Sequence, residues 1–147
     1  MSITFTKGNL FDSSAQTLGH GCNTKGKMGA GIALDFKRRF PDMYKEYRRR
    51  CYKDMLNPGG YFLYKHSEPW VLNLATQASS LSAHIEYVEQ CLGSLTNNYK
   101  SEGMKSLALP RIASGLGGLE WGEVKRLLIY HLDPLDIPVT VYEEYEA

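Results

Sequence analysis

The amino-acid sequence predicts an α/β fold in which helices cover both faces of a central mixed sheet. Short runs rich in β-branched and aromatic residues alternate along the chain with stretches of helical periodicity. Several of the short runs are apolar throughout, which is typical of strands buried on both faces. The chain has 147 residues, 43% of them hydrophobic, and this length suits one domain with its own core.

The first third of the chain contains two predicted strands and two predicted helices. Residues 3–6 alternate between apolar and polar, and residues 18–23 form a second short run. Apolar side chains recur every four residues from Ile32 to Phe40, which indicates a helix. Pro41 ends that helix and begins the next one.

The rest of the chain continues the alternation. Its predicted elements are strands at 61–64 and 70–74, a helix at 85–99, a strand at 107–109, a helix at 121–132 and a strand at 139–142. We expect the strands at 61–64 and 70–74 to be neighbours in the sheet. The stripe from Ile85 to Tyr99 is the most regular in the sequence, and Gly103 follows it as a stop signal.

Composition and charge exclude several classes of protein. The 17 Lys and Arg residues are balanced by 16 Asp and Glu, so the net charge is +1 and indiscriminate binding to nucleic acid is not expected. The three cysteines and four histidines have no spacing typical of disulfide frameworks or metal sites. No apolar run approaches the ~20 residues of a membrane span. We therefore expect a monomeric, cytoplasmic protein with no metal, no cofactor and no membrane partner.

A glycine-rich loop connects the second predicted strand to the first predicted helix. It runs from Asn23 to Ile32, and we expect Gly29 and Gly31 to adopt positive φ and to let the backbone approach a ligand. The helix after it begins near Ala30 and directs free N–H groups and its positive dipole end outward, which suits a phosphate. The alternative is an ordinary loop whose glycines only turn the chain.

This loop does not fit two familiar phosphate-binding motifs. No Gly-Lys-Ser/Thr follows, as a Walker loop requires. Gly29-x-Gly31 lacks the small residue expected three positions further on, because Leu34 stands there, and it follows the second strand rather than the first. Dinucleotide-dependent oxidoreductase chemistry is therefore disfavoured.

A second glycine-rich loop, Pro110 to Leu119, lies between the strand at 107–109 and the helix that begins at Trp121. Ser114 and three glycines again offer backbone donors close to a helix start. Two such loops, each between a buried strand and a helix, could clamp a diphosphate from opposite sides. The alternative is two unrelated turns.

Together these motifs resemble the macrodomain family. The residues that carry the resemblance are Lys7-Gly8-Asn9-Leu10, Lys27 to Ala33, Leu109 to Ile112, Ser114 to Leu116 and Val139 to Tyr142. The most similar branch contains the terminal ADP-ribose protein glycohydrolase, the DNA ADP-ribosyl glycohydrolases and the chromatin-remodeller macrodomain. The resemblance implies a single three-layer α/β/α macrodomain at residues 1–147 that binds ADP-ribose across the strand ends.

The resemblance also implies which residues bind ADP-ribose. Asn9 matches an acidic residue that accepts a hydrogen bond from the adenine amine, Leu10 packs on adenine, and Tyr142 matches an aromatic residue that stacks near it. The implied phosphate-binding residues are Met28, Gly29, Ala30, Gly31 and Ile32 in the first loop and Pro110, Arg111, Ile112, Ala113, Ser114, Gly115, Leu116 and Gly117 in the second.

The resemblance weakens at the catalytic positions. The lysine that the glycohydrolase branch uses after the fourth strand falls on Gln77, and its aspartate in the second loop falls on Gly117. Neither residue supplies a Schiff-base amine or a carboxylate base. Asn23 lies where the distal ribose is implied to be, and it is the candidate catalytic residue because its amide can orient a water or a ribose hydroxyl.

Other side chains near this position have two interpretations. His20 is either a catalytic base or a hydrogen-bonded histidine within the sheet. Ser79, Ser80 and Ser82 either border the distal ribose or form an ordinary loop and helix cap.

A basic run occupies residues 37–53, with eight Lys and Arg residues diluted by Asp35, Asp42 and Glu46. The simpler interpretation is the solvated side of two helices. The functional alternative is a surface that holds ADP-ribosylated nucleic acid through phosphate contacts.

The expected function is binding of ADP-ribose and hydrolysis of ADP-ribosyl esters on acidic side chains, without the lysine–aspartate pair of the relatives. The alternatives are a non-catalytic reader of ADP-ribose and an ADP-ribose 1″-phosphate phosphatase. The expected partners are ADP-ribose, an ADP-ribosylated protein or an ADP-ribosylated nucleic acid.

Overall fold

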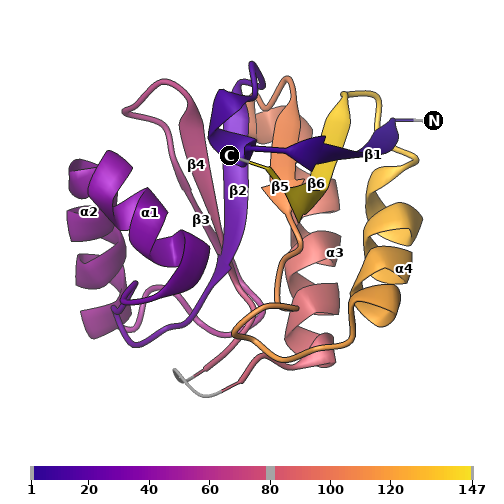
Figure 1. Ribbon diagram of the computed structural model, residues 1–147. Helices are drawn as coiled ribbons and strands as arrows, with labels where there is room; N and C mark the ends of the chain where they lie inside the picture. Colours follow the sequence, from indigo (N-terminus) through magenta and orange to yellow (C-terminus); the bar gives the residue numbers. More distant parts are fainter. Residues whose placement is uncertain (1, 79–81, 147) are drawn as a thin grey trace.

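The structure is a computed structural model that describes residues 2–78 and 82–146 (Figure 1). Its elements in chain order are β1 (Ile3–Gly8), the 3₁₀ helix η1 (Leu10–Asp12), β2 (Thr17–Cys22), α1 (Gly31–Arg39), α2 (Pro41–Tyr52), β3 (Tyr61–Tyr64), β4 (Trp70–Ala75), α3 (Ile85–Glu102), β5 (Leu107–Pro110), α4 (Trp121–Leu132) and β6 (Val139–Tyr145).

These strands form one mixed sheet in the order β1-β6-β5-β2-β4-β3. The neighbouring strands run parallel to one another except β3, which pairs antiparallel with β4. The carboxyl ends of β1, β6, β5, β2 and β4 therefore lie along one edge, which is where ligands bind in α/β folds. The predicted α/β class and the predicted pairing of 61–64 with 70–74 are confirmed.

Helices cover both faces of the sheet, with α1 and α2 on one face and α3 and α4 on the other (Figure 1). Alternate residues of β4 divide between the two cores, because successive side chains of a strand point to opposite faces. Leu72 and Leu74 pack with α3 and α4, whereas Val71 and Ala75 pack with α1 and α2. Each face of the sheet is thus closed by its own apolar layer.

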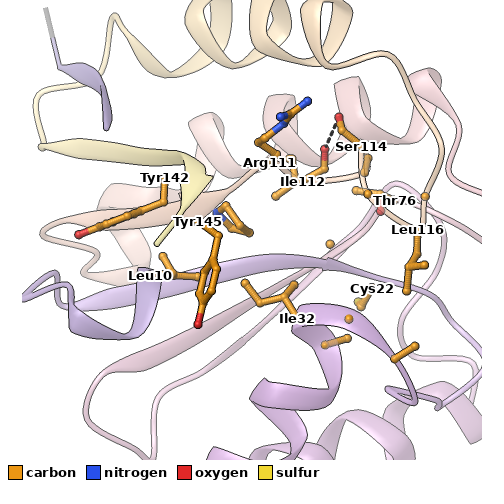
Figure 2. A pocket seen from close by; sticks show the side chains of 18 of the residues that line it. Leu10, Cys22, Ile32, Thr76, Arg111, Ile112, Ser114, Leu116, Tyr142 and Tyr145 are labelled. Carbon is orange, nitrogen blue, oxygen red and sulfur yellow. Dashed lines mark hydrogen bonds between the residues drawn. The ribbon is translucent and has the colours of Figure 1, made fainter. Parts of the chain in front are cut away.

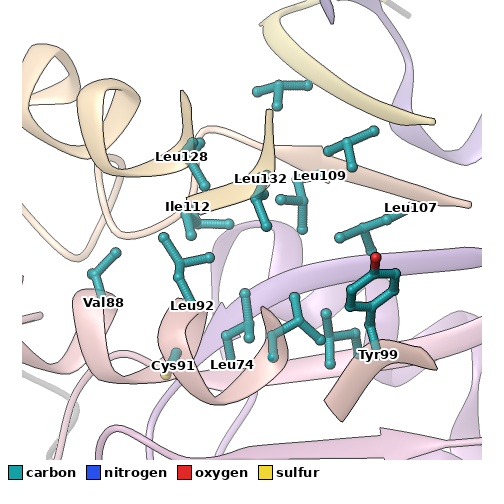
Figure 3. Close-up of a cluster of buried hydrophobic side chains, with 14 of the residues drawn as sticks. Leu74, Val88, Cys91, Leu92, Tyr99, Leu107, Leu109, Ile112, Leu128 and Leu132 are labelled. Carbon is teal, nitrogen blue, oxygen red and sulfur yellow. The ribbon is translucent and has the colours of Figure 1, made fainter. Parts of the chain in front are cut away.

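The predicted stripe on α3 is the centre of the larger core (Figure 3). Val88, Leu92 and Leu95 are fully buried, and burial of each such side chain contributes about 1.5–3 kcal/mol. Gly103 ends the helix in the left-handed conformation with φ of 85°, as the stop signal predicted.

The structure differs from the predicted elements near the carboxyl edge of the sheet. β1 continues to Gly8, two residues beyond the predicted strand. The last strand continues to Tyr145, because Glu144 and Tyr145 pair with Lys7 and Gly8 of β1. The short helix η1 was not predicted at all. Among residues 2–78 and 82–146, no helix combines the length and the hydropathy needed to cross a membrane.

Candidate functional site

A cleft of about 1200 Å³ opens at the carboxyl edge of the sheet, between the two glycine-rich loops (Figure 2). Its walls come from the ends of β2, β4, β5 and β6 and from the start of α1. Every residue of both loops that was expected to bind phosphate lines this cleft, as do Leu10, Asn23 and Tyr142. The fold therefore brings nearly all of the predicted binding residues to one place.

The first loop is held in shape by the Asn23 side chain and by α2. The Asn23 amide donates from Nδ2 to the Lys27 carbonyl at 2.9 Å, and its Oδ1 accepts from the Lys25 N–H at 2.9 Å. The buried Tyr47 hydroxyl lies 2.8 Å from both Oδ1 and the carbonyl oxygen of Asn23 and donates to them. Asn23 thus has a structural role, and the second N–H of its amide has no partner among residues 2–78 and 82–146. Its catalytic role stays a prediction.

The turn into α1 leaves backbone donors open to the cleft. Gly31 has φ of 60°, as expected, but Gly29 lies outside the left-handed region, so that expectation is wrong for Gly29. A Cβ built on Gly29 meets no heavy atom within 4 Å, so a side chain at this position would enter open space. Ala30 is the N-cap, and no side chain in the described chain caps the first turn of α1. Its free N–H groups and the helix dipole favour an anion.

The second loop is compact and leaves no room for a side chain at Gly117, the position that matches the relatives' aspartate. Ala113 has φ of 61°, and its carbonyl accepts from Leu119 N at 3.0 Å. The Ser114 hydroxyl donates to the Ile112 carbonyl at 3.1 Å, which Figure 2 marks as a dashed line. A Cβ built on Gly117 lies only 2.7 Å from the Ala113 carbonyl oxygen. A side chain at position 117 therefore requires the loop to move.

The two loops approach each other at the mouth of the cleft. A Cβ built on Gly31 lies 3.1 Å from Cδ1 of Leu116, so the two loops are close neighbours there. Leu116 is exposed and projects from the second loop. A ligand that passes between the loops would meet backbone on both sides.

One end of the cleft is apolar and aromatic. Figure 2 shows Leu10, Tyr142 and Tyr145 together at this end. Tyr145 is 72% exposed, and it was missed because the last strand was expected to end at Tyr142. Asn9, in contrast, does not line the cleft, since it caps η1 through an Oδ1 that accepts from Phe11 N at 3.0 Å. A contact between Asn9 and adenine stays a prediction that this geometry does not support.

Arg111 lies on the cleft wall with its side chain turned outward. Its guanidinium is 5.3 Å from the centre of the Trp121 ring, and Figure 2 shows it directed away from Leu10 and Ile32. A phosphate contact from Arg111 would therefore come from its backbone.

His20 is a core residue, so a role for it as a base in the cleft is wrong. Its Nε2 lies 2.7 Å from Oδ1 of Asn73, and its ring stacks on Phe36 with centroids 4.1 Å apart. Complete burial lowers the pKa of His20 to about 4. His20 does not line the cleft, and its alternative interpretation as a hydrogen-bonded histidine of the sheet is confirmed.

The other end of the cleft is polar. Asn23, Thr76 and Gln77 lie there at the ends of β2 and β4. Within the described part of the chain, the acidic residues that line the cleft all come from the opposite end, and they are Glu143, Glu144 and Glu146. The polar end therefore offers amides and a hydroxyl rather than a carboxylate.

Of the serines that follow β4, only Ser82 is among the described residues. Ser82 is exposed and does not line the cleft, and Ser79 and Ser80 lie outside the described residues. The segment is instead tied to the first loop by a hydrogen bond of 3.0 Å from the Thr24 hydroxyl to the Ala78 carbonyl.

The fold divides the basic run between different surfaces. Arg49 and Arg50 both bond to Glu46, at 2.6 and 2.9 Å, and these bonds lower the pKa of the Glu46 carboxyl to about 2. Arg48 turns the other way, and its Nε donates to the Tyr52 hydroxyl at 3.1 Å. Arg48 is therefore held by a different partner from Arg49 and Arg50.

The family model described as Macro domain matches residues 20–128, which include both glycine-rich loops. The chain belongs to the Macro domain family. The macrodomain is 35% identical over 150 residues to the DNA ADP-ribosyl glycohydrolase of Thermus aquaticus, covering 98% of this chain and 42% of that protein. It is also 35% identical over 161 residues to the DNA ADP-ribosyl transferase–DNA ADP-ribosyl glycohydrolase fusion protein of Thermosipho africanus, covering 96% of this chain and 42% of that protein.

The macrodomain thus spans about two fifths of the length of these curated relatives. A shorter relative is the ADP-ribose 1″-phosphate phosphatase of Lodderomyces elongisporus, 31% identical over 97% of this chain and 100% of that protein.

Solved structures agree with the fold. The macrodomain of Thermus aquaticus DarG superposes with a TM-score of 0.90 at 35% identity, covering 96% of this chain and 97% of that one. The structure of Thermosipho africanus DarTG in complex with ADP-ribose gives a TM-score of 0.91 at 35% identity, covering 99% of this chain and 41% of that one. The predicted three-layer α/β/α macrodomain with a mixed sheet is confirmed.

Proposed function

We propose that the cleft binds ADP-ribose and that the macrodomain hydrolyses the bond between ADP-ribose and a carrier. The observation that carries this proposal is the order of surfaces within one cleft: an aromatic end, two glycine-rich loops and a polar end. ADP-ribose has the same order of groups, namely adenine, diphosphate and distal ribose. The similarity to a DarTG structure that holds ADP-ribose supports the same ligand.

The aromatic end of the cleft suits adenine, and the two glycine-rich loops suit the two phosphates. Leu10, Tyr142 and Tyr145 offer apolar and aromatic faces to adenine, and stacking of a base on one aromatic ring contributes about 1–3 kcal/mol. The uncapped start of α1 offers N–H groups and a positive dipole end to one phosphate. The residues that follow Ala113 offer backbone donors to the other phosphate.

In the proposed hydrolysis, a phosphate oxygen of the substrate acts as the general base, in place of a protein side chain. Gln77 stands at the position of the relatives' lysine, and Gly117 has no room for a carboxylate side chain. In the proposed step, a water held by a phosphate oxygen attacks C1″ of the distal ribose, and the bond from C1″ to the carrier breaks. The phosphate oxygen accepts the proton of the water and returns it to the leaving carrier. The free amide N–H of Asn23 orients the ribose for this attack.

The carrier is part of the proposal. An ester on an acidic protein side chain is the linkage expected from the sequence, whereas the relatives named DNA ADP-ribosyl glycohydrolase favour a nucleic acid. Monomeric action in the cytoplasm also belongs to the proposal, and the near-neutral charge and three free, buried cysteines agree with it.

A non-catalytic reader is the second candidate, and the amide-rich polar end favours it. Because Gln77 and Gly117 replace the relatives' lysine and aspartate, tight binding without turnover is the simplest alternative. A phosphatase acting on ADP-ribose 1″-phosphate is favoured by the relative of that name.

The test is release of ADP-ribose from three substrates: auto-modified protein, an ADP-ribosylated oligonucleotide and ADP-ribose 1″-phosphate. Gly29→Glu places bulk and negative charge in open space beside the phosphate-binding N–H groups and should abolish release. Gly93→Glu is the matched control, because Gly93 lies within α3 and a Cβ there also meets nothing within 4 Å. It should retain release.

Release of ADP-ribose that depends on an intact Gly29 supports the hydrolase. Binding without release over hours at stoichiometric protein leaves the reader, and release of phosphate alone leaves the phosphatase. Unchanged release by Gly29→Glu contradicts the assignment of the cleft.

A further inference from the structure

The first loop and the carboxyl end of α2 form one continuous surface beside the polar end of the cleft. The Tyr44 hydroxyl donates to the Gly26 carbonyl at 2.9 Å. Gly26 adopts φ of 79°, and a Cβ built on it lies 3.2 Å from Cε1 of Tyr52 and 3.4 Å from Cγ of Arg48. Because the loop backbone packs on these two side chains, residues of the loop and of α2 face solvent together.

This surface carries cations that no carboxylate neutralises. Lys25, Lys27 and Arg48 are exposed, and none of them forms a salt bridge within residues 2–78 and 82–146. Arg49 and Arg50 on the same helix are instead held by Glu46. The structure thus separates free cations next to the cleft from paired cations further along α2.

An exposed aromatic ring lies among these cations. Tyr52 is 63% exposed, although large aromatic side chains normally bury most of their surface. The Arg48 guanidinium lies 5.1 Å from the ring centre, and its Nε donates to the Tyr52 hydroxyl. This pair holds the ring in place at the surface. An aromatic face among cations is typical of sites for single-stranded nucleic acid, where bases stack and phosphates pair with Lys and Arg.

The position of this surface suits a carrier rather than ADP-ribose itself. Lys27 and Asn23 line the cleft at the end opposite Leu10 and Tyr142. If adenine occupies the aromatic end, the distal ribose lies at the polar end. A group attached to the ribose then leaves the cleft beside Lys27 and meets Tyr52 and Arg48 next.

We propose that Lys25, Lys27, Arg48 and Tyr52 form a carrier surface that binds the single-stranded nucleic acid to which ADP-ribose is attached. The lysines and Arg48 pair with phosphates, and Tyr52 stacks on a base adjacent to the modified nucleotide. This inference rests on the proposed function, since it requires ADP-ribose in the cleft. An acidic protein segment would pair with the cations but would gain nothing specific from an exposed aromatic ring.

The test compares the binding of a fluorescent single-stranded oligonucleotide carrying one ADP-ribose with the binding of free ADP-ribose. Lys25→Ala combined with Arg48→Ala removes two free cations and leaves the cleft-lining Lys27 intact. We expect about tenfold weaker binding of the modified oligonucleotide and a salt dependence (slope of log K against log[salt]) that is shallower by about 1.4. Affinity for free ADP-ribose should stay unchanged.

The matched control is Lys45→Ala combined with Arg49→Ala, which also removes two cations, both from positions of α2 that do not line the cleft. It should bind the modified oligonucleotide like the wild type. For the ring, Tyr52→Leu keeps an apolar contact with Gly26 but loses the stacking face, and we expect about tenfold weaker binding. Tyr52→Phe keeps that face and should retain affinity.

The outcomes separate the inference from the proposed function. If wild-type protein does not bind ADP-ribose, both are overturned. If the wild type binds ADP-ribose but the Lys25→Ala/Arg48→Ala variant binds the modified oligonucleotide as well as the Lys45→Ala/Arg49→Ala control does, only the carrier surface is overturned. The inference is also overturned if the variants lose affinity for an ADP-ribosylated peptide as strongly as for the oligonucleotide, since the carrier would then be a protein.

Discussion

His20 is an imidazole that the fold keeps neutral by surrounding it with the Phe36 ring and the sheet. Its pKa is about 4 in the folded protein against 6.5 for the free group, so the unfolded chain binds more protons between these values. The free energy of unfolding should therefore fall as the pH drops from about 6.5 to about 4, by up to about 3 kcal/mol from this group.

Chemical denaturation at pH 7 and pH 5 measures this effect when wild type is compared with His20→Gln, which keeps a polar group for Asn73 but does not titrate. We expect wild type to lose more stability than the variant over this interval. Equal losses would contradict a buried neutral His20.

Gly117 illustrates why the catalytic pattern of the relatives does not transfer to this chain. Because its Cβ position lies 2.7 Å from a backbone oxygen, Gly117→Ala should lower the free energy of unfolding by about 1–3 kcal/mol. Gly115→Ala on the same loop is the control, since a Cβ there meets nothing within 4 Å and the backbone has no positive φ. Similar midpoints for the two variants in urea denaturation would mean that the loop adapts freely.

At the scale of elements, α2 shapes the first loop through its buried tyrosine. Burial raises the pKa of Tyr47 far above its usual value, so the hydroxyl stays a donor to Asn23 at every accessible pH. Tyr47→Phe should lower stability by about 1 kcal/mol and loosen the loop, with weaker binding of ADP-ribose as the consequence. Calorimetry and hydrogen exchange of the loop amides measure the two effects. Tyr130→Phe, at an exposed position on α4, should change neither.

Local sequence patterns predict every strand of the sheet and every α-helix of the two layers that cover it. They can do so because each apolar pattern lies within a single segment of the chain. The extension of β6 and the helix η1 depend on partners elsewhere: Tyr145 pairs with Gly8 across the sheet, and η1 is capped by Asn9. For the same reason, the motif that predicted Tyr142 as an adenine contact could not reveal Tyr145.

At the scale of the whole molecule, the sheet order converts scattered motifs into one site. The two glycine-rich loops are separated by 77 residues in the sequence (33–109), yet β2 and β5 are neighbours and bring them together. Strand order and side-chain direction are long-range properties that the sequence patterns did not contain. Their absence from the sequence patterns explains why the sequence could not decide between the two interpretations of His20 and why the capping of η1 by Asn9 was not foreseen.

The fold also separates positive from negative charges, which nearly cancel in the net charge of +1. Lys27 lines the polar end of the cleft, Lys25 and Arg48 belong to the surface beside it, and Glu143, Glu144 and Glu146 lie at the aromatic end. An anionic carrier should therefore favour the polar end, which is the orientation that places adenine at Tyr142 and Tyr145.

Calorimetric titration with ADP-ribose tests the central claim most directly, because binding in the cleft is required by every function discussed above. We expect one ADP-ribose to bind per chain, no binding by Gly29→Glu and wild-type affinity in Gly93→Glu. Absence of heat at millimolar ADP-ribose, or undiminished affinity of Gly29→Glu, would contradict the account.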